Sequence, residues 1–420
     1  MAISGVTDWD RLLAGDPALV ADPYPAYARL RNEAPVHRST TLNSWVVTRY
    51  DDVVSGLRDS RLSAHRLPAL LGVADVTARE RALMLRRAAT QMINSDPPDH
   101  ARRRSLVSAS FLPRRIEALR PRIQAVADEL IDEVIERGEM DVVGDYAFPL
   151  PMAIISDIVG IRPGDGPRVK AWADDVSNFL SSGHVGPDQV AAYLGSWGQL
   201  ADYFTALSAE LAGSGGDDVV SQLALRLEAG ETDLEEVLSN LVLLAVAGHE
   251  TTTNTTAVGL SWLLRRPVEL ERLRRDPSLI ATAIEELLRY EATSQWDFRI
   301  AVEDIAIGDR EIRAGELVNF VLAAANRDPA QFPEPDRLDV GRAPNRHVTF
   351  GIGAHFCLGS QLARLELQIA IGTLVTRLDD LEMVGASPDW KPNVRIRGLT
   401  SLPVRFRPGR QSKASRPTAT

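Results

Sequence analysis

Phe350-Gly351-Ile352-Gly353-Ala354-His355-Phe356-Cys357-Leu358-Gly359 is the stretch that decides the fold of this chain of 420 residues. Cys357 is the only cysteine, so it cannot form an intramolecular disulfide. The glycines on both sides of it suit a tight, irregular loop that lets the backbone approach something flat and bulky. The stretch therefore presents a single thiol from a loop shaped for a close neighbour.

A helix is predicted directly after this loop, because Leu358, Leu362, Leu365 and Ile369 recur at helical spacing. The N–H groups and the dipole at the start of a helix favour a thiolate at Cys357. A deprotonated sulfur in that position is a metal ligand or a nucleophile. The alternative is a buried structural cysteine, which behaves as a small apolar residue.

A second unusual stretch lies in the middle of a long apolar helix. Thr232-x-x-Glu235 is a capping box, and the helix that it starts is predicted to reach Arg265, a length of about 50 Å. Its centre is Ala247-Gly248-His249-Glu250-Thr251-Thr252, which puts a glycine, an acid and β-branched alcohols where a buried helix disfavours them. A buried acid needs a partner or a role, so the stretch predicts a site. For Thr252 to Thr256 the alternative is a packing kink with satisfied hydroxyl groups.

Two pairs of charged residues lie at helical spacing. His100 and Arg104 follow a Pro pair and lie four residues apart, so they share one helical face. A cationic pair there suits a ligand with two carboxylates, and a solvated basic face is the alternative. Glu286 and Arg289 are three residues apart and within pairing distance, which alone is typical of an ordinary surface pair.

Composition excludes several classes of protein. The net charge of −10 argues against a nucleic-acid partner. A single cysteine fits a reducing, intracellular compartment, and Met1 to Gly15 lacks the pattern of a secretion signal. No run reaches the roughly 18 to 20 apolar residues that a membrane span needs. These features predict a cytoplasmic protein without a membrane anchor.

Phe-Gly-x-Gly-x-His-x-Cys-x-Gly is similar to the haem-ligand loop of the cytochrome P450 superfamily, and Ala-Gly-x-Glu-Thr resembles its oxygen-binding motif. Matching motifs run in the right order from Asp22 to Val404. The resemblance implies a mainly α fold with a small β-rich region (α+β), shaped as a triangular prism with haem between the long central helix and the Cys357 helix. It implies one catalytic domain over residues 1–408, and residues 409–420 are predicted to be a disordered tail.

The resemblance also implies roles for individual residues. Cys357 is the axial thiolate on the iron of haem b and favours O–O cleavage. Gly248 makes room for dioxygen, Thr251 hydrogen-bonds it, and Glu250 relays protons from solvent. Glu286 and Arg289 form a structural ion pair. The other expected haem contacts are His100, Arg104, Arg299, His355, Phe350, Gly351, Gly359 and Ala247.

The expected substrate pocket combines apolar and polar residues. Its predicted members are Leu243, Val246, Leu399, Ser294, Gln295 and Trp296. Because two of these are polar, we expect a mainly apolar substrate with a polar group near Ser294 or Gln295. The alternative is that Trp296 packs into the core and Gln295 bonds to backbone. Residues 63–93 correspond to the variable lid over the substrate, or to a surface loop with a short helix.

The function implied is monooxygenation, in which one atom of O2 enters an organic substrate by hydroxylation or epoxidation, in secondary metabolism. No flavin or dinucleotide motif is visible, so the electrons are expected from a ferredoxin and its NAD(P)H-dependent reductase. Arg103 and Arg364 are candidates to dock this acidic partner, and the enzyme is expected to be a monomer. Alternatives are a peroxide-driven haem-thiolate enzyme, and a non-catalytic haem or partner-recruiting protein of the same fold.

Overall fold

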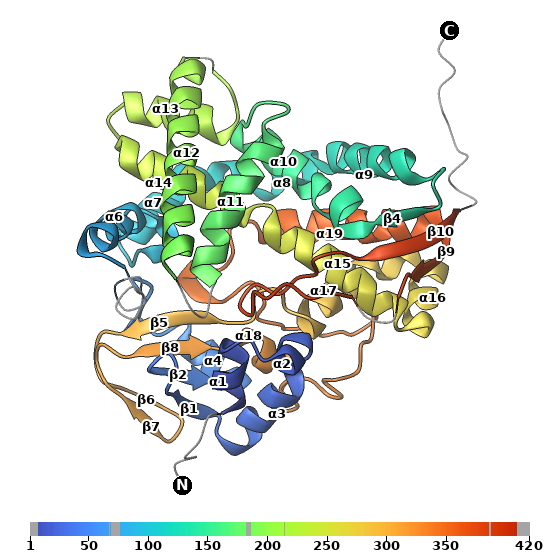
Figure 1. The fold of residues 1–420 in the computed structure, drawn as a ribbon, viewed down its shortest axis with the longest axis horizontal. Helices are drawn as coiled ribbons and strands as arrows, with labels where there is room; N and C mark the ends of the chain where they lie inside the picture. Colours follow the sequence, from blue (N-terminus) through green and yellow to red (C-terminus); the bar gives the residue numbers. More distant parts are fainter. Residues whose placement is uncertain are drawn as a thin grey trace.

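The computed structural model describes residues 7–66, 68, 76–181, 186–213, 215–385 and 388–409. The fold has a β-rich region and a larger helical region. In Figure 1 the β-rich region lies below the helical region. The predicted tail, residues 409–420, lies outside the described residues from residue 410 onwards. Of the expected lid over residues 63–93, residues 67 and 69–75 also lie outside them. The described part of the fold is mainly helical with small sheets, as the sequence predicts.

The β-rich region joins two parts of the chain that are far apart in sequence. Its five-stranded sheet has the order β1-β2-β8-β5-β3. The strands are β1 (Val36–Ser39), β2 (Ser44–Val47), β3 (Leu62–Ser63), β5 (Asp297–Ala301) and β8 (Leu317–Phe320). Strands β2 and β8 are parallel, with Ser44 opposite Leu317, and the other pairs are antiparallel. This pairing fixes β5, and with it Arg299, against the amino-terminal part of the chain.

The two faces of this sheet pack into two different cores. Val46 and Leu317 belong to a cluster with Trp9, whereas Val47 and Val318 belong to a second cluster. This follows from the alternation of side chains along a strand. The first cluster is covered by α1 (Asp8–Leu13), α2 (Pro17–Ala21) and α3 (Tyr24–Glu33); α4 (Tyr50–Gly56) and the hairpin β6 (Ile305–Ile307) and β7 (Arg310–Ile312) contribute to the second.

The helical region surrounds the largest core. Its principal helices are α6 (Ala78–Ala89), α7 (Asp99–Ser108), α8 (Pro113–Ala118), α9 (Arg120–Val134), α10 (Pro149–Val159), α11 (Gly166–Ser181), α12 (Pro187–Leu211), α13 (Val219–Glu228), α16 (Pro267–Arg275), α17 (Ile280–Tyr290) and α19 (Ser360–Arg377). The short helix α18 (Leu322–Ala325) belongs to the two cores of the β-rich region. A second sheet, in the order β4 (Glu139–Asp141), β10 (Pro403–Pro408), β9 (Leu378–Met383), lies beside α19. Within this region one stretch, Val142–Val159, is long and apolar enough to cross a membrane by length and composition, and 56% of it is buried inside the fold, as in a core helix.

The long central helix is interrupted, which the sequence did not predict. It forms α14 (Leu234–Ala247) and α15 (Glu250–Leu264), with a break at Gly248 and His249. Glycine is a poor helix former, and the side chains around the break bond to carbonyl groups of the preceding turn. His249 Nδ1 lies 2.9 Å from the Ala245 carbonyl oxygen, and the Thr251 hydroxyl donates to that of Ala247 over 3.4 Å.

The start of this helix also differs from the prediction by one residue. The cap is Asp233, whose carboxylate accepts the Glu236 N–H over 2.8 Å. The Thr232 hydroxyl donates to the Glu236 side chain over 2.6 Å. The predicted capping box was therefore wrong in register, because an aspartate adjacent to the threonine is an equally good cap.

Candidate functional site

The Cys357 loop is held by its own backbone. The Cys357 N–H donates to the Phe350 carbonyl over 2.9 Å, and the Phe356 N–H donates to that of Gly353 over 3.1 Å. Gly351 and Gly353 have φ of 69° and 78°, a region that favours glycine. Helix α19 begins at Ser360, directly after the loop. The loop thus places Cys357 in front of the helix, as its spacing predicts.

Burial raises the pKa of the Cys357 thiol, although the Gly359 N–H and the charges of Arg104 and Arg364 act in the opposite direction. Burial therefore acts against the effect of the helix start, which favours a thiolate at this position. The residue keeps accessible surface even so. A metal ion bound to the sulfur would supply the positive charge that stabilises the thiolate.

A cluster of cations lies beside the loop, around a single carboxylate. The Arg299 guanidinium donates to Asp297 over 2.7 Å, and Arg66 lies 3.8 Å from the same carboxylate. Burial acts to raise the pKa of Asp297, but Arg299, Arg66 and Arg395 outweigh it and lower the pKa strongly. Burial, opposed by Asp297, lowers the pKa of Arg66 to about 9.

Two imidazole rings extend this cluster towards the cysteine. His100 and His355 lie with ring centroids 4.0 Å apart. Burial, followed by the charges of Arg299, His100 and Arg66, lowers the pKa of His355 to about 3. Burial and Arg104 lower the pKa of His100 as well. Cations that depress each other's protonation fit a site for an anion, and the two propionates of haem are anions of the right kind.

Arg104 reaches the cysteine loop from α7. Its guanidinium donates to the Phe356 carbonyl over 2.8 Å, which leaves further N–H groups free for a ligand since a guanidinium has five. Arg66 and Arg395 belong to the same cluster but were missed in the sequence. No spacing rule connects them, because residue 66 follows β3 and residue 395 lies in the carboxyl-terminal loop.

The break between α14 and α15 exposes backbone in the middle of the molecule. Ala247 is exposed, and Gly248 and Thr251 are half-buried. A Cβ atom on Gly248 would lie 2.4 Å from Ile155 of α10. The glycine is therefore required by packing against α10, a reason that the sequence motif does not reveal.

The alcohols that follow the break bond within the helix. The hydroxyl groups of Thr253, Thr255 and Thr256 donate to the carbonyl groups four residues earlier, over 2.8 to 2.9 Å. This supports the packing alternative for these three residues. Glu250, by contrast, accepts a hydrogen bond from Ser177 of α11, and the Lys391 ammonium lies 4.0 Å from its other oxygen.

Glu366 is a buried acid that the sequence reading overlooked. It lies on α19 with 1% of its surface exposed. Burial raises its pKa to about 8, and the nearby Thr252 side chain only partly offsets this. Neither carboxyl oxygen has a hydrogen-bond partner among the described residues. The signal available in the sequence was an acid within the apolar helical pattern that follows Cys357, nine residues after the cysteine.

The predicted substrate pocket needs correction. Trp296 packs edge-on against Trp9, with centroids 4.9 Å apart, in the core beneath the five-stranded sheet. Gln295 is fully buried and accepts from the Tyr27 hydroxyl over 3.0 Å while donating to the Ala292 carbonyl. Leu399 is also fully buried, in the main core. The core alternative therefore holds for Trp296 and Gln295, and Leu399 offers no surface to a substrate.

The other predicted pocket residues remain accessible in part. Leu243 and Val246 of α14 are half-buried at the edge of the main core. Ser294 is half-buried and pairs with Ile396 in an isolated bridge. Of the predicted pocket residues, these three therefore keep accessible surface that a substrate could contact.

The two arginines expected to dock an electron donor are already engaged. Arg103 donates to Glu236 over 2.8 Å, and Arg364 donates to both oxygens of Glu285 over 2.7 and 3.0 Å. Burial acts to raise the pKa of Glu285, but His347 and Arg364 outweigh it and lower the pKa to about 2. Both arginines therefore already pair with acids of the same chain, and their role in docking a partner stays a prediction.

The predicted ion pair is an internal structural element. Arg289 donates to both oxygens of Glu286 over 2.7 and 2.8 Å, and both side chains are fully buried. Glu286 also accepts from Arg342 over 3.1 Å, and Arg289 donates to the Asn326 carbonyl over 2.9 Å. The pair thus ties α17 to the segment that leads towards the cysteine loop.

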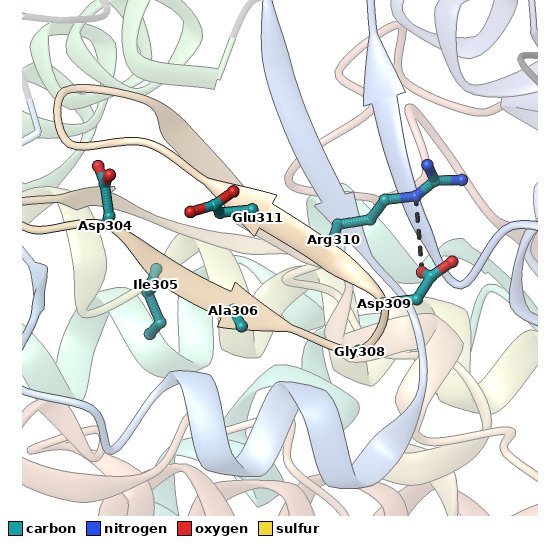
Figure 2. Close-up of a pocket in the computed structure, with 7 residues that line it drawn as sticks. All are labelled: Asp304, Ile305, Ala306, Gly308, Asp309, Arg310 and Glu311. Carbon is teal, nitrogen blue, oxygen red and sulfur yellow. Dashed lines mark ion pairs between the residues drawn. The ribbon is translucent and has the colours of Figure 1, made fainter.

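A further pocket lies on the hairpin β6–β7, as Figure 2 shows. Its lining residues are Asp304, Ile305, Ala306, Gly308, Asp309, Arg310 and Glu311. Arg310 pairs with Asp309 there over 3.5 Å. None of these residues belongs to the predicted site, so this pocket is not a candidate for the chemistry of Cys357.

Known proteins resemble this chain along nearly its whole length. The family model described as Cytochrome P450 matches residues 217–389. Cytochrome P450 107B1 of Saccharopolyspora erythraea is 41% identical over 404 residues, which cover 94% of this chain and 97% of that protein. Cytochrome P450 monooxygenase PikC of Streptomyces venezuelae is 38% identical over 403 residues, covering 93% of each. The crystal structure of P450BioI in complex with acyl carrier protein ligated to hexadec-9Z-enoic acid has a TM-score of 0.87 and 36% identity, covering 93% of this chain and 100% of that one.

A lone cysteine before a helix, close to more buried cations than acids, defines a class of protein that carries haem on a thiolate. The relatives specify it further. The chain belongs to the cytochrome P450 family, whose members bind haem iron through a cysteine and oxidise small molecules with O2. The predicted fold, cofactor and enzyme class are confirmed by these comparisons.

Proposed function

We propose that this enzyme inserts one oxygen atom of O2 into a mainly apolar organic substrate, by hydroxylation or epoxidation, in secondary metabolism. The single observation that carries the proposal is that one chain combines an accessible cysteine before a helix with an acid and an alcohol at the break in its central helix. Haem, when bound, supplies an iron whose thiolate ligand favours O–O cleavage. Residues 1–408 are proposed to act as one catalytic unit.

Cys357 would hold the iron. Arg299 and Arg104 would bind the propionates through their charges, joined by Arg66. His100 and His355 would contact them as neutral hydrogen-bond donors, because burial and the neighbouring arginines lower the pKa of both imidazoles. Phe350, Gly351, Gly359 and Ala247 would contact the ring of the haem. The Arg364 guanidinium lies 4.5 Å over the Phe350 ring, which orients that ring beside the cysteine loop.

Glu250 and Thr251 would deliver protons to the oxygen substrate. Glu250 is the side chain that can take up and release a proton here, and its carboxylate is held by Ser177 and Lys391. Thr251 follows it directly and would present its hydroxyl to the oxygen. Gly248 would keep this part of the helix close to α10.

The substrate would contact Leu243, Val246 and Ser294, the predicted pocket residues that keep accessible surface. A ferredoxin with its reductase would supply the electrons, in the cytoplasm, to a monomeric enzyme. Arg103 and Arg364 stay predicted docking residues for this donor, although both pair with acids of the same chain. Retention of Glu250 and Thr251 favours this route over a peroxide-driven enzyme, and retention of Cys357 favours it over a protein without catalytic activity.

Substitution of Thr251 tests the proposal. The reconstituted system with a surrogate ferredoxin and reductase should convert a substrate found by its spectral shift. Thr251→Ala should keep that shift and still consume NAD(P)H, but it should divert electrons to hydrogen peroxide. If the variant couples NAD(P)H to product as well as the parent does, the role of Thr251 is wrong. Turnover with peroxide alone, at an undiminished rate in Thr251→Ala, would support the peroxide-driven alternative.

A further inference from the structure

Glu250 has a contact that its family motif does not contain. Lys391 lies in the carboxyl-terminal loop, 141 positions further along the printed sequence, and its ammonium group is 4.0 Å from Glu250 Oε1. The side chain of Lys391 is 30% exposed, whereas that of Glu250 is only 11% exposed. The lysine therefore connects a nearly buried acid with the solvent.

The position of Lys391 is fixed by its neighbours. Its ammonium donates to Asn254 Oδ1 over 3.1 Å, and its N–H donates to the Gly398 carbonyl over 2.9 Å. A Cβ atom on Gly398 would lie 2.2 Å from the Asn254 side chain. The loop is thus packed against α15, one turn after Glu250, and it holds the ammonium in reach of the acid.

The choice of lysine at this position is informative. Only three of the 47 basic residues in the sequence are lysines, at positions 170, 391 and 413. Arginine is charged at every pH of interest and cannot give up a proton in a protein, whereas an ammonium group can. A chain that uses arginine for most of its ion pairs has a lysine beside Glu250, a cation that can exchange protons.

We propose that Lys391 carries protons from solvent to Glu250. An N–H bond of the ammonium breaks and an O–H bond forms on Glu250 Oε1, once the two groups close from 4.0 Å to hydrogen-bond distance or a water bridges them. A hydronium ion from the solvent then protonates the amine and leaves as water. The acid and the amine are both neutral between these two transfers, so charge and protons balance. Lys391 acts through Glu250 and is therefore a positioning residue for the reaction proposed above, on which this inference rests.

Helix α11 supplies the second contact of Glu250. Ser177 of α11 donates to Glu250 Oε2, so each oxygen of the acid faces a different group. Ser177 holds the carboxylate in place, and Lys391 would supply its proton. Lys170 lies on the same helix but pairs with Asp174 instead of Glu250, which makes it a matched control.

Two variants separate proton transfer from charge. Lys391→Arg keeps the positive charge and removes proton exchange, whereas Lys391→Met removes both. In the reconstituted holoenzyme, both should lower the coupling of NAD(P)H to product severalfold and increase the solvent isotope effect on product formation. Lys170→Met should leave both quantities unchanged. Full coupling in Lys391→Arg together with loss in Lys391→Met would overturn the relay and leave a purely electrostatic role.

A second measurement does not depend on turnover. Reductive methylation with 13C-formaldehyde labels the few lysines and gives resolved NMR signals, and the Lys391 signal is assigned by its absence in Lys391→Arg. The chemical shift of this signal should change in Glu250→Gln, because the ammonium loses its neighbouring carboxylate. An unchanged chemical shift would contradict contact between Lys391 and Glu250. If the wild-type protein forms no product but the signal moves in Glu250→Gln, the proposed function fails while the contact stands.

Discussion

Two buried groups of arginines around a single acid differ in what they bind. Around Glu286, the guanidinium groups of Arg289 and Arg342 both bond to one carboxylate, and carbonyl groups accept further N–H groups of Arg289. In the cluster around Asp297, the charges of three guanidinium groups act on one carboxylate beside two imidazoles. The Glu286 group is bonded within the protein and ties segments of the chain together. The Asp297 cluster is the group proposed above to bind the propionates of haem.

The largest expected effect comes from breaking the Glu286–Arg289 pair. Arg289→Met removes the fully buried partner of Glu286 and leaves only Arg342 to pair with it, and removal of one partner from a buried pair costs about 3–5 kcal/mol. Urea unfolding of the holoenzyme should show this loss in the free energy of unfolding. Arg337→Met, at an exposed pair with Glu334, is the control and should change it by less than about 1 kcal/mol. Equal losses in the two variants would contradict the structural role of Arg289.

Glu366 is a third case, a buried acid whose described neighbours include no cation. Because burial raises its pKa to about 8 from an ordinary 4.5, the folded state keeps a proton that the unfolded chain has released between these values. The free energy of unfolding should therefore fall as pH rises through this window, by at most about 1.4 kcal/mol per pH unit.

Glu366→Gln should remove this contribution. Urea unfolding at about pH 5 and about pH 7.5 should show a smaller decrease for the variant than for the parent, by roughly 2–3 kcal/mol. Parallel decreases in both proteins would show that Glu366 is ionised in the folded state.

A smaller effect is expected in the cluster around Asp297. Arg299→Ala removes one cation expected to bind a propionate, and a charge-assisted bond contributes roughly 1.5–3 kcal/mol. Haem transfer to an acceptor protein should therefore become about 10- to 100-fold faster. Arg104→Ala should act in the same direction, and unchanged rates in both variants would count against the propionate assignment.

Much of this arrangement could be predicted from the sequence because it depends on local spacing. The loop at Cys357, the helix after it and the pair at Glu286 and Arg289 each lie within a few residues of one another. Helical periodicity and glycine placement therefore contain the necessary information.

The remainder depends on contacts between distant parts of the chain. Arg66, Arg395 and Lys391 reach the site from loops, and Trp296 meets Trp9 only because β5 joins the amino-terminal sheet. The interrupted central helix was missed for a related reason. The glycine, acid and alcohols at its centre mark a site but do not show that the helix ends there, and the clash that Gly248 avoids involves Ile155 of another helix.

The state of Cys357 tests the central claim most directly. The account predicts that the reduced protein with carbon monoxide shows the red-shifted Soret band of an iron bound to thiolate, and that Cys357→Ala lacks this band. An unshifted band typical of an iron bound to histidine in the parent protein, or an unaltered red-shifted band in Cys357→Ala, would contradict it.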